Sequence, residues 1–143
     1  MQLNNTTTRT ALVLASGALL AVSVALFATN TNASNVGKWM APASANGMKN
    51  PVAKNAASLQ DGKKIFTKEC VSCHGSKGLG NGPKASDLSK PPVNLTTHEF
   101  QSQSDGAIFW KITNGNKPMP MFRTAYSDQE RWSVVNYLRT LGK

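Results

Sequence analysis

The clearest hydrophobic pattern of the chain lies near its C-terminus. Large apolar residues recur there at three-residue steps, and two more widen the stripe: Trp132, Val135, Leu138 and Leu141, then Val134 and Tyr137. The preceding Ser127-Asp128-Gln129-Glu130 has the form of a capping box, in which serine and glutamate satisfy backbone amides at a helix start. The pattern predicts a helix that begins after Ser127, buries one face and ends at Gly142.

A second helix is predicted from Ser58, a good N-cap, to Cys70. Its apolar residues Ile65 and Phe66 recur with Cys70 at helical spacing. Gly62 lies one turn before Phe66, where the missing side chain would let another helix approach closely. We therefore expect a helix crossing at Gly62.

A third helix is predicted over residues 104–114. Ser104 or Asp105 caps it, Ile108 and Ile112 share one face, and Gly115 ends it. The segment 75–95 that precedes it is rich in glycine and proline, which excludes regular structure there. Residues 58–143 are thus expected to be one small domain of helices joined by irregular loops.

The first thirty-three residues have the pattern of an export segment. A polar stretch with one positive charge, Arg9, is followed by an uncharged run over residues 11–28 and by small residues before a possible cleavage point after Ala33. This order is typical of a secretory signal peptide. The uncharged run also reaches the lower length limit of a membrane-spanning helix, so residues 1–33 are either a cleaved signal peptide or a retained membrane anchor.

Residues 34–57 are expected to be a linker or a strap. They are rich in Ala, Asn, Ser, Gly and Pro, contain three lysines and no acidic residue, and show no helical or strand period. Such a composition favours a disordered tether. Trp39 points to the alternative, because a tether has little use for a large aromatic side chain that could pack onto the domain or onto a partner protein.

The chain is basic, with sixteen Lys and Arg against seven Asp and Glu and a formal net charge of +9. The charge is spread along the chain without a long run of one sign, so it does not indicate a nucleic-acid-binding arm. A cationic surface instead predicts protein partners with acidic docking surfaces.

Five consecutive residues carry the strongest chemical signal: Cys70-Val71-Ser72-Cys73-His74. C-x-x-C-H is the attachment signature of a c-type haem, in which the two thiols bind the porphyrin and the histidine binds the iron. A redox-active cysteine pair, a disulfide and half of a zinc site are the alternatives. A zinc site would need a second ligand pair, and a thioredoxin-like pair would need a βαβ pattern that the sequence lacks.

The second iron ligand is expected in the loop between the last two helices. Met119 and Met121 are both available there, and Pro118 and Pro120 restrict the backbone of Met119. A thioether is a soft ligand that raises the reduction potential relative to a second histidine. Met119 is the preferred candidate, and His98 is the competing ligand.

Short motifs from Ser58 to Leu141 occur in an order that is similar to one known family. They are Gly62-Lys63-Lys64-Ile65-Phe66, Cys70-x-x-Cys73-His74-Gly75, Gly78-Leu79-Gly80-Asn81-Gly82-Pro83, Pro92-Val93-Asn94-Leu95-Thr96, Ile112-Thr113-Asn114-Gly115, Met119-Pro120-x-Phe122 and Trp132-x-Val134-Val135-Asn136-Tyr137-Leu138-Arg139. In this order they resemble class I c-type cytochromes of the bacterial single-haem type. Similar proteins often have Asp where this chain has Asn81.

The resemblance implies an all-α cytochrome c fold, with helices packed around one covalently bound haem c and its iron. It implies that the first and last helices cross near Gly62, and that His74 and Met119 are the axial iron ligands. A backbone carbonyl near Pro83, or near Pro91 or Pro92, is expected to accept the His74 ring N–H and so fix the ring.

The function implied is one-electron transfer between redox partner proteins in an exported respiratory or related electron-transfer chain, without a small-molecule substrate or a catalytic residue. The location implied is the periplasm or another extracytoplasmic space, where the N-terminal segment could associate with a membrane. A haem-c subunit of a membrane-bound oxidoreductase complex is the first alternative. A haem peroxidase would need an open iron position with an acid–base residue, and a haem sensor would need a signalling domain.

Overall fold

The computed structural model describes residues 38–142, and helices form the regular structure of this part of the chain. Three of them exceed two turns: α2 (Ala56–Ile65), α5 (Asp105–Asn114) and α6 (Asp128–Leu138). Three short ones are α1 (Ala43–Asn46), α3 (Val71–His74) and α4 (His98–Gln101). Within residues 38–142 no strand forms, only an isolated bridge between Asn116 and Met119, which confirms the all-α expectation.

The helix that leads to the cysteines begins earlier than the sequence predicted. Asn55, not Ser58, is its N-cap, and Ser58 is the third helical residue of a capping box in which each side chain accepts from the other residue's amide. After Ile65 the chain continues without a break through η2 (Phe66–Cys70), a π-helical turn, into α3. The cysteine motif therefore closes a continuous helical run.

The caps predicted for the other two long helices are confirmed. The Ser104 hydroxyl accepts from the Ala107 amide at the start of α5, and Ser127 and Glu130 form the capping box of α6. Gly115 ends α5 with a positive φ of 64°, which glycine adopts readily. The predicted end of α6 at Gly142 was wrong. The α-helix stops at Leu138, and the residues from there to Gly142 form turns.

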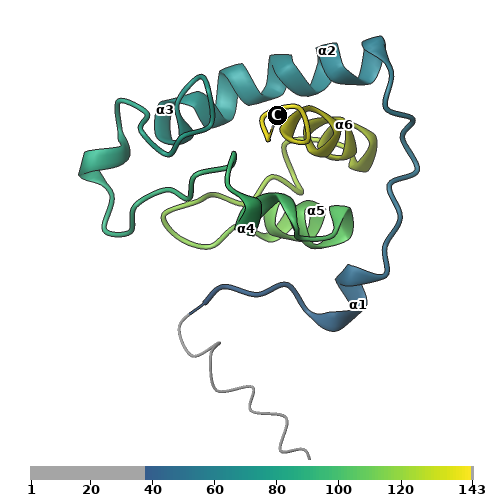
Figure 1. Cartoon of the computed structure of the whole chain (residues 1–143), viewed down its shortest axis with the longest axis horizontal. Helices are drawn as coiled ribbons and strands as arrows, with labels where there is room; N and C mark the ends of the chain where they lie inside the picture. The colour runs from purple at the N-terminus through teal and green to yellow at the C-terminus, as the bar shows by residue number, and fades with distance from the viewer. Residues whose placement is uncertain (1–37, 143) are drawn as a thin grey trace, which may run out of the picture. The chain divides into compact units, whose positions relative to one another are not determined.

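The predicted crossing of the first and last helices is confirmed at Gly62, where α2 packs across α6 (Figure 1). A Cβ atom at Gly62 would lie 2.1 Å from the Ser133 carbonyl oxygen and 2.9 Å from Tyr137 Cβ. Phe66 packs one turn later, with its ring centroid 5.2 Å from that of Tyr137. Only glycine allows the two backbones to come this close.

Helix α6 is buried on nearly every side, which the one-sided stripe did not predict. It lies between α2 and α5, and the Trp132 ring stacks on Phe109 of α5 with centroids 4.0 Å apart. Its polar residues Ser133 and Asn136 are buried as well. Asn136 is satisfied by hydrogen bonds to the Val52 carbonyl, the Ser58 hydroxyl and the Asn50 amide.

The described part of the expected linker is ordered against the helices. We call residues 38–55 the N-terminal strap. Helix α1 of the strap packs on α5, where a Cβ atom at Gly106 would lie 2.0 Å from the Ala45 carbonyl oxygen. The ring centroid of Trp39 lies 6.2 Å from that of Trp110 on α5. Trp39 thus packs onto the helical domain.

The predicted signal peptide or membrane anchor, residues 1–33, lies outside the described residues. Between residues 38 and 142, no helix has the length and apolar content to cross a membrane.

Candidate functional site

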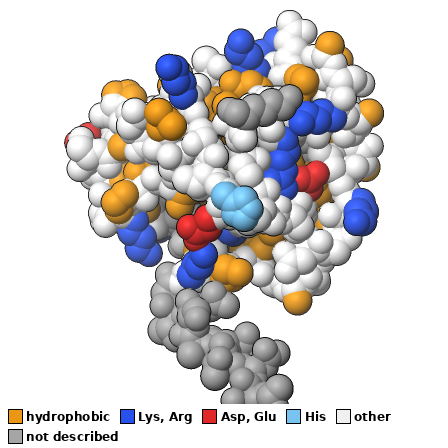
Figure 2. All heavy atoms as spheres, in the orientation of Figure 1, with side chains coloured by type: hydrophobic (Ala, Val, Ile, Leu, Met, Phe, Trp, Pro, Cys, Tyr) orange, Lys and Arg blue, Asp and Glu red, His pale blue; other side chains and the backbone are white. Residues whose placement is uncertain are grey.

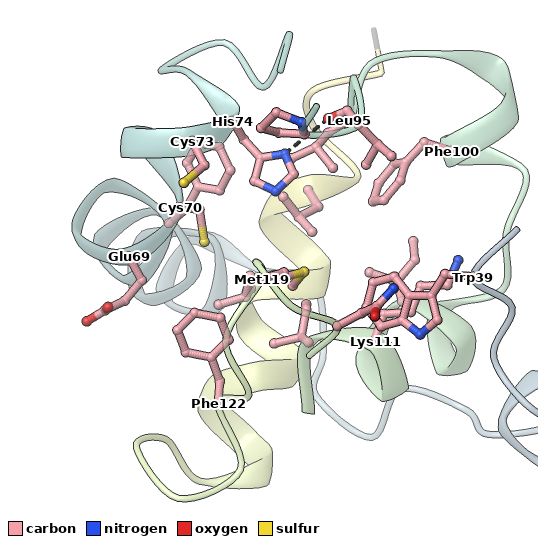
Figure 3. Close-up of a pocket in the computed structure, with 18 of the residues that line it drawn as sticks. Trp39, Glu69, Cys70, Cys73, His74, Leu95, Phe100, Lys111, Met119 and Phe122 are labelled. Carbon is pink, nitrogen blue, oxygen red and sulfur yellow. Dashed lines mark hydrogen bonds between the residues drawn. The ribbon is translucent and has the colours of Figure 1, made fainter. Parts of the chain in front are cut away.

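One cavity of about 610 Å³ brings together the four predicted site residues. Cys70, Cys73 and His74 come from the end of the η2–α3 run, and Met119 comes from the loop between α5 and α6. Figure 3 shows His74 and Met119 on opposing sides of this space, with both cysteine sulfurs at one end of it. We call the wall formed by residues 70–74 the proximal wall and the wall around Met119 the distal wall.

The glycine-rich segment after His74 holds the end of the proximal helix. The backbone amides of Gly80, Gly82 and Lys84 donate to the carbonyls of His74, Cys73 and Ser72 at 2.8, 3.0 and 2.8 Å. These carbonyls would otherwise be unsatisfied at the end of α3. The loop therefore fixes the direction in which the histidine leaves the helix.

The His74 ring is oriented by a different carbonyl from the one first expected. Its Nδ1–H donates to the Val93 carbonyl at 3.0 Å, so the prediction near Pro83 was wrong. The acceptor instead follows Pro92, one of the alternative positions. Because a carbonyl can only accept, Nδ1 carries the hydrogen and Nε2 keeps its lone pair for a metal ion.

Burial shapes the protonation of both ends of the motif. Burial raises the pKa of the Cys70 thiol to about 12, so this thiol is protonated at neutral pH. A thiol whose pKa is raised is a poor match for a redox-active pair, which needs a lowered thiol pKa. Burial also lowers the pKa of His74, which keeps the imidazole neutral and able to bind a metal.

The distal loop places one of the two candidate methionines in the cavity. Asn116 and Met119 exchange two backbone hydrogen bonds of 2.9 Å, and the Phe122 amide donates to the Ile112 carbonyl at the end of α5. Met119 lines the cavity, whereas Met121 is 53% exposed and lies outside it. His98, the competing ligand, is exposed at the start of α4 and does not line the cavity.

The cavity also has a far end that the sequence did not reveal. Trp39 of the N-terminal strap and Lys111 of α5 lie there, on the side away from the cysteines (Figure 3). The Lys111 ammonium is 5.5 Å from the centre of the Trp39 ring. Trp39 stood out in the sequence as an unusual aromatic residue in a linker, but nothing there linked Trp39 to Lys111, which lies far along the chain.

The donor set and the cavity fit a haem group. Two thiols at one end match its two vinyl groups, and a nitrogen and a thioether face each other as a pair of axial ligands would. Buried apolar side chains line the space between them: Phe66, Leu95, Phe100, Ile108, Ile112 and Phe122. Both cysteines are free thiols rather than a disulfide, so they remain available for attachment.

Comparison with known proteins places the chain among cytochromes. A family model described as "Cytochrome C oxidase, cbb3-type, subunit III" matches residues 57–138. Cytochrome c6 of Anabaena variabilis is 36% identical over 88 residues, which cover 61% of this chain and 93% of that protein. Cytochrome c6 of Synechococcus sp. is 31% identical over 83 residues, covering 58% of this chain and 70% of that protein.

Two solved structures are similar as well. The KustC0563 c-type cytochrome aligns with a TM-score of 0.50 and 28% identity. The alignment covers 58% of this chain and 99% of the KustC0563 chain. A chain of the Kuenenia stuttgartiensis reducing HAO-like protein complex Kustc0457/Kustc0458 aligns with a TM-score of 0.61 and 32% identity over 68% of this chain. The present chain spans about half (48%) of that longer one. The chain belongs to the family of the model that matches residues 57–138. With the relatives above, this makes it a class I c-type cytochrome, an electron-transfer protein with covalently bound haem c and its iron.

Proposed function

We propose that the protein is a one-electron carrier in which Cys70 and Cys73 attach the haem and His74 and Met119 are the axial iron ligands. The observation that carries the proposal is the opposition of His74 and Met119 across a cavity with both cysteine sulfurs at one end (Figure 3). The haem, when bound, supplies the ferric–ferrous couple through which the electron passes.

The side chains divide the remaining work between them. His74, fixed by the Val93 carbonyl, presents Nε2 from the proximal wall. Met119 presents its sulfur from the distal wall, where a soft ligand favours the ferrous state. With both axial positions filled, no substrate could reach the iron. The buried apolar side chains of the lining disfavour water around the bound group.

A reduced and an oxidised visible spectrum, taken with and without carbon monoxide, tests the ligation. A carrier with His and Met bound should react poorly with carbon monoxide, because the gas must displace the methionine. Rapid and complete binding of carbon monoxide would contradict the carrier and favour an enzyme or a sensor with an open iron position.

We also propose that the protein works outside the cytoplasm, in the periplasm or an equivalent space. The pattern of residues 1–33 and the covalent haem support this, because c-type haem is attached outside the cytoplasm. N-terminal sequencing of the protein purified from its native cells distinguishes the two forms: a start at Ser34 supports a cleaved signal peptide, and a start before residue 11 supports a retained anchor.

Docking to acidic redox partners is proposed from the distribution of charge. Figure 2 shows basic side chains scattered over this face of the molecule and few acidic ones among them. Five exposed lysines flank the haem-binding segments: Lys63, Lys64, Lys77, Lys84 and Lys117. Complementary charge raises the rate of encounter between proteins, and salt screens the attraction over about 8–10 Å.

Stopped-flow reduction by an acidic partner protein tests this docking. The rate should fall several-fold between low and physiological ionic strength. Changing Lys77 and Lys84 to Gln should lower both the rate and its dependence on salt. A rate independent of salt would mean that docking is apolar or that the protein is already held in a complex.

A second candidate function is that of a haem-c subunit of an oxidoreductase complex. The neighbour from the HAO-like complex favours it, because the alignment covers 68% of this chain, a larger share than the two cytochrome c6 relatives above. Size-exclusion chromatography with light scattering, on the protein isolated from native membranes or periplasm, decides between a free carrier and a subunit. A free carrier elutes with the mass of one short chain, and a subunit elutes with its partners.

A further inference from the structure

The far end of the cavity, away from the cysteines, contains an ammonium group that forms no ion pair within the part of the chain that the structure describes. Lys111 is half-buried, and its Nζ donates to the neutral Gln103 amide oxygen. Burial lowers the pKa of Lys111, which is the sign of a charge removed from water. Among the ion pairs of residues 38–142, none includes Lys111.

Two other cations that line the cavity have carboxylate partners. Lys38 pairs with Glu99, and Arg131 pairs with Asp128. A partly buried charge is costly unless an opposite charge compensates it. Lys111 itself pairs with no carboxylate of the described residues: Glu99, whose charge also acts on it, is paired with Lys38, and the ammonium contacts only the neutral Gln103 amide and the face of the Trp39 ring.

The chemistry of haem offers such a counter-ion at this place. The vinyl groups that take part in thioether bonds and the two propionate carboxylates lie at opposite edges of the porphyrin. If the vinyl edge is fixed at Cys70 and Cys73, the carboxylates point to the other end of the cavity. Figure 3 shows Trp39 and Lys111 at that end.

We propose that Lys111 and Trp39 form the binding site for the haem propionates, with Lys111 as the counter-ion and Trp39 as its cover. This inference rests on the proposed attachment at the two cysteines. The Trp39 ring lies near both the Lys111 ammonium and the Trp110 ring, and the N-terminal strap that carries it packs on α5. The strap thus takes part in the haem site.

A cation fixed beside the haem favours the ferrous state, because the added electron is stabilised by positive charge. The midpoint reduction potential of Lys111→Gln should therefore lie below that of the wild type. Lys49→Gln is the matched control, since Lys49 is an exposed strap residue outside the cavity. It removes the same charge and should leave the potential nearly unchanged.

Salt and a conservative variant separate a local ion pair from a general charge effect. The Lys111→Gln shift should persist in about 1 M salt, where a solvent-exposed pair would be screened. Lys111→Arg keeps the charge and should restore most of the potential. In the background of Trp39→Ala, which opens the site to water, the Lys111→Gln shift should shrink as salt is added.

A Lys111→Gln shift no larger than that of Lys49→Gln, or one abolished by salt in the wild-type background, would overturn the inference. The proposed function is checked separately on the same samples by haem retention after denaturation and by the spectrum of methionine ligation. Wild-type protein that passes both checks while Lys111 has no effect refutes the propionate site alone.

Discussion

The two walls of the haem cavity are built in different ways. The proximal wall is five consecutive residues at the end of a continuous helical run, and the amides of residues 80–84 fix its carbonyl end. The distal wall is a loop in which Met119 is held by two backbone bonds with Asn116 and by the anchoring of Phe122 to α5. The first wall is thus one helical run whose residues are consecutive in sequence, whereas the second is an irregular loop anchored to the end of α5.

The largest effect is expected from removing the two cysteines of the proximal wall. Wild-type protein should keep its haem after denaturation, because thioether bonds to Cys70 and Cys73 survive unfolding. A variant with both cysteines changed to Ala should release haem into acidified organic solvent. Met119→Ala, a change in the distal wall, is the control and should retain it. Extraction of haem from the denatured wild type would disprove the covalent assignment.

A change in the distal wall should alter the iron without releasing the haem. Met119→Ala should abolish the weak near-infrared band of ferric iron–methionine ligation and lower the reduction potential. Met121→Ala should leave both unchanged, because Met121 is exposed outside the cavity. The reverse result for the two variants would assign the ligand to Met121.

The same contrast explains what the sequence could predict. The attachment motif, the capping boxes and the Gly62 crossing could be inferred because each depends on neighbouring residues or one fixed spacing. The helix start at Asn55 was missed because Ser58 is also a good cap when taken alone. The Val93 carbonyl and the pairing of Trp39 with Lys111 depend on contacts between distant segments, for which spacing carries no signal.

The next largest effect is expected from a substitution at the crossing of α2 and α6, which supports the proximal wall. Gly62→Ala places a Cβ atom 2.1 Å from the Ser133 carbonyl oxygen, so the helices must separate. We expect the free energy of unfolding to fall by about 1–3 kcal/mol, although alanine favours helices. Urea unfolding measures it, and Gly47→Ala is the control because its Cβ would meet only one atom, 4.0 Å away. Equal midpoints would argue against the crossing.

A smaller effect is expected at a hydrogen bond that joins the two walls. Tyr126 follows the distal loop in sequence. Its hydroxyl donates to the carboxylate of Glu69, the residue before Cys70, at 2.7 Å. Tyr126→Phe should reduce the free energy of unfolding by about 1 kcal/mol at neutral pH, since the partly exposed acceptor regains water. Tyr137→Phe is the matched control, because the Tyr137 hydroxyl makes no hydrogen bond within residues 38–142. Equal losses in the two variants would contradict a role for the Tyr126 bond.

The pH dependence of this bond provides the finest test of the link between the walls. The hydrogen bond from Tyr126 lowers the pKa of the Glu69 carboxyl, because it favours the ionised form. A carboxyl whose pKa is lower in the folded state stabilises the fold above its unfolded pKa of about 4.3, and this stabilisation is lost as pH falls through the folded value. The difference in unfolding midpoint between wild type and Tyr126→Phe should therefore be largest near neutral pH and shrink below about pH 4. A difference that stays constant down to pH 3 would mean that Tyr126 stabilises the loop by packing alone, and that the two walls are not joined through the charge of Glu69.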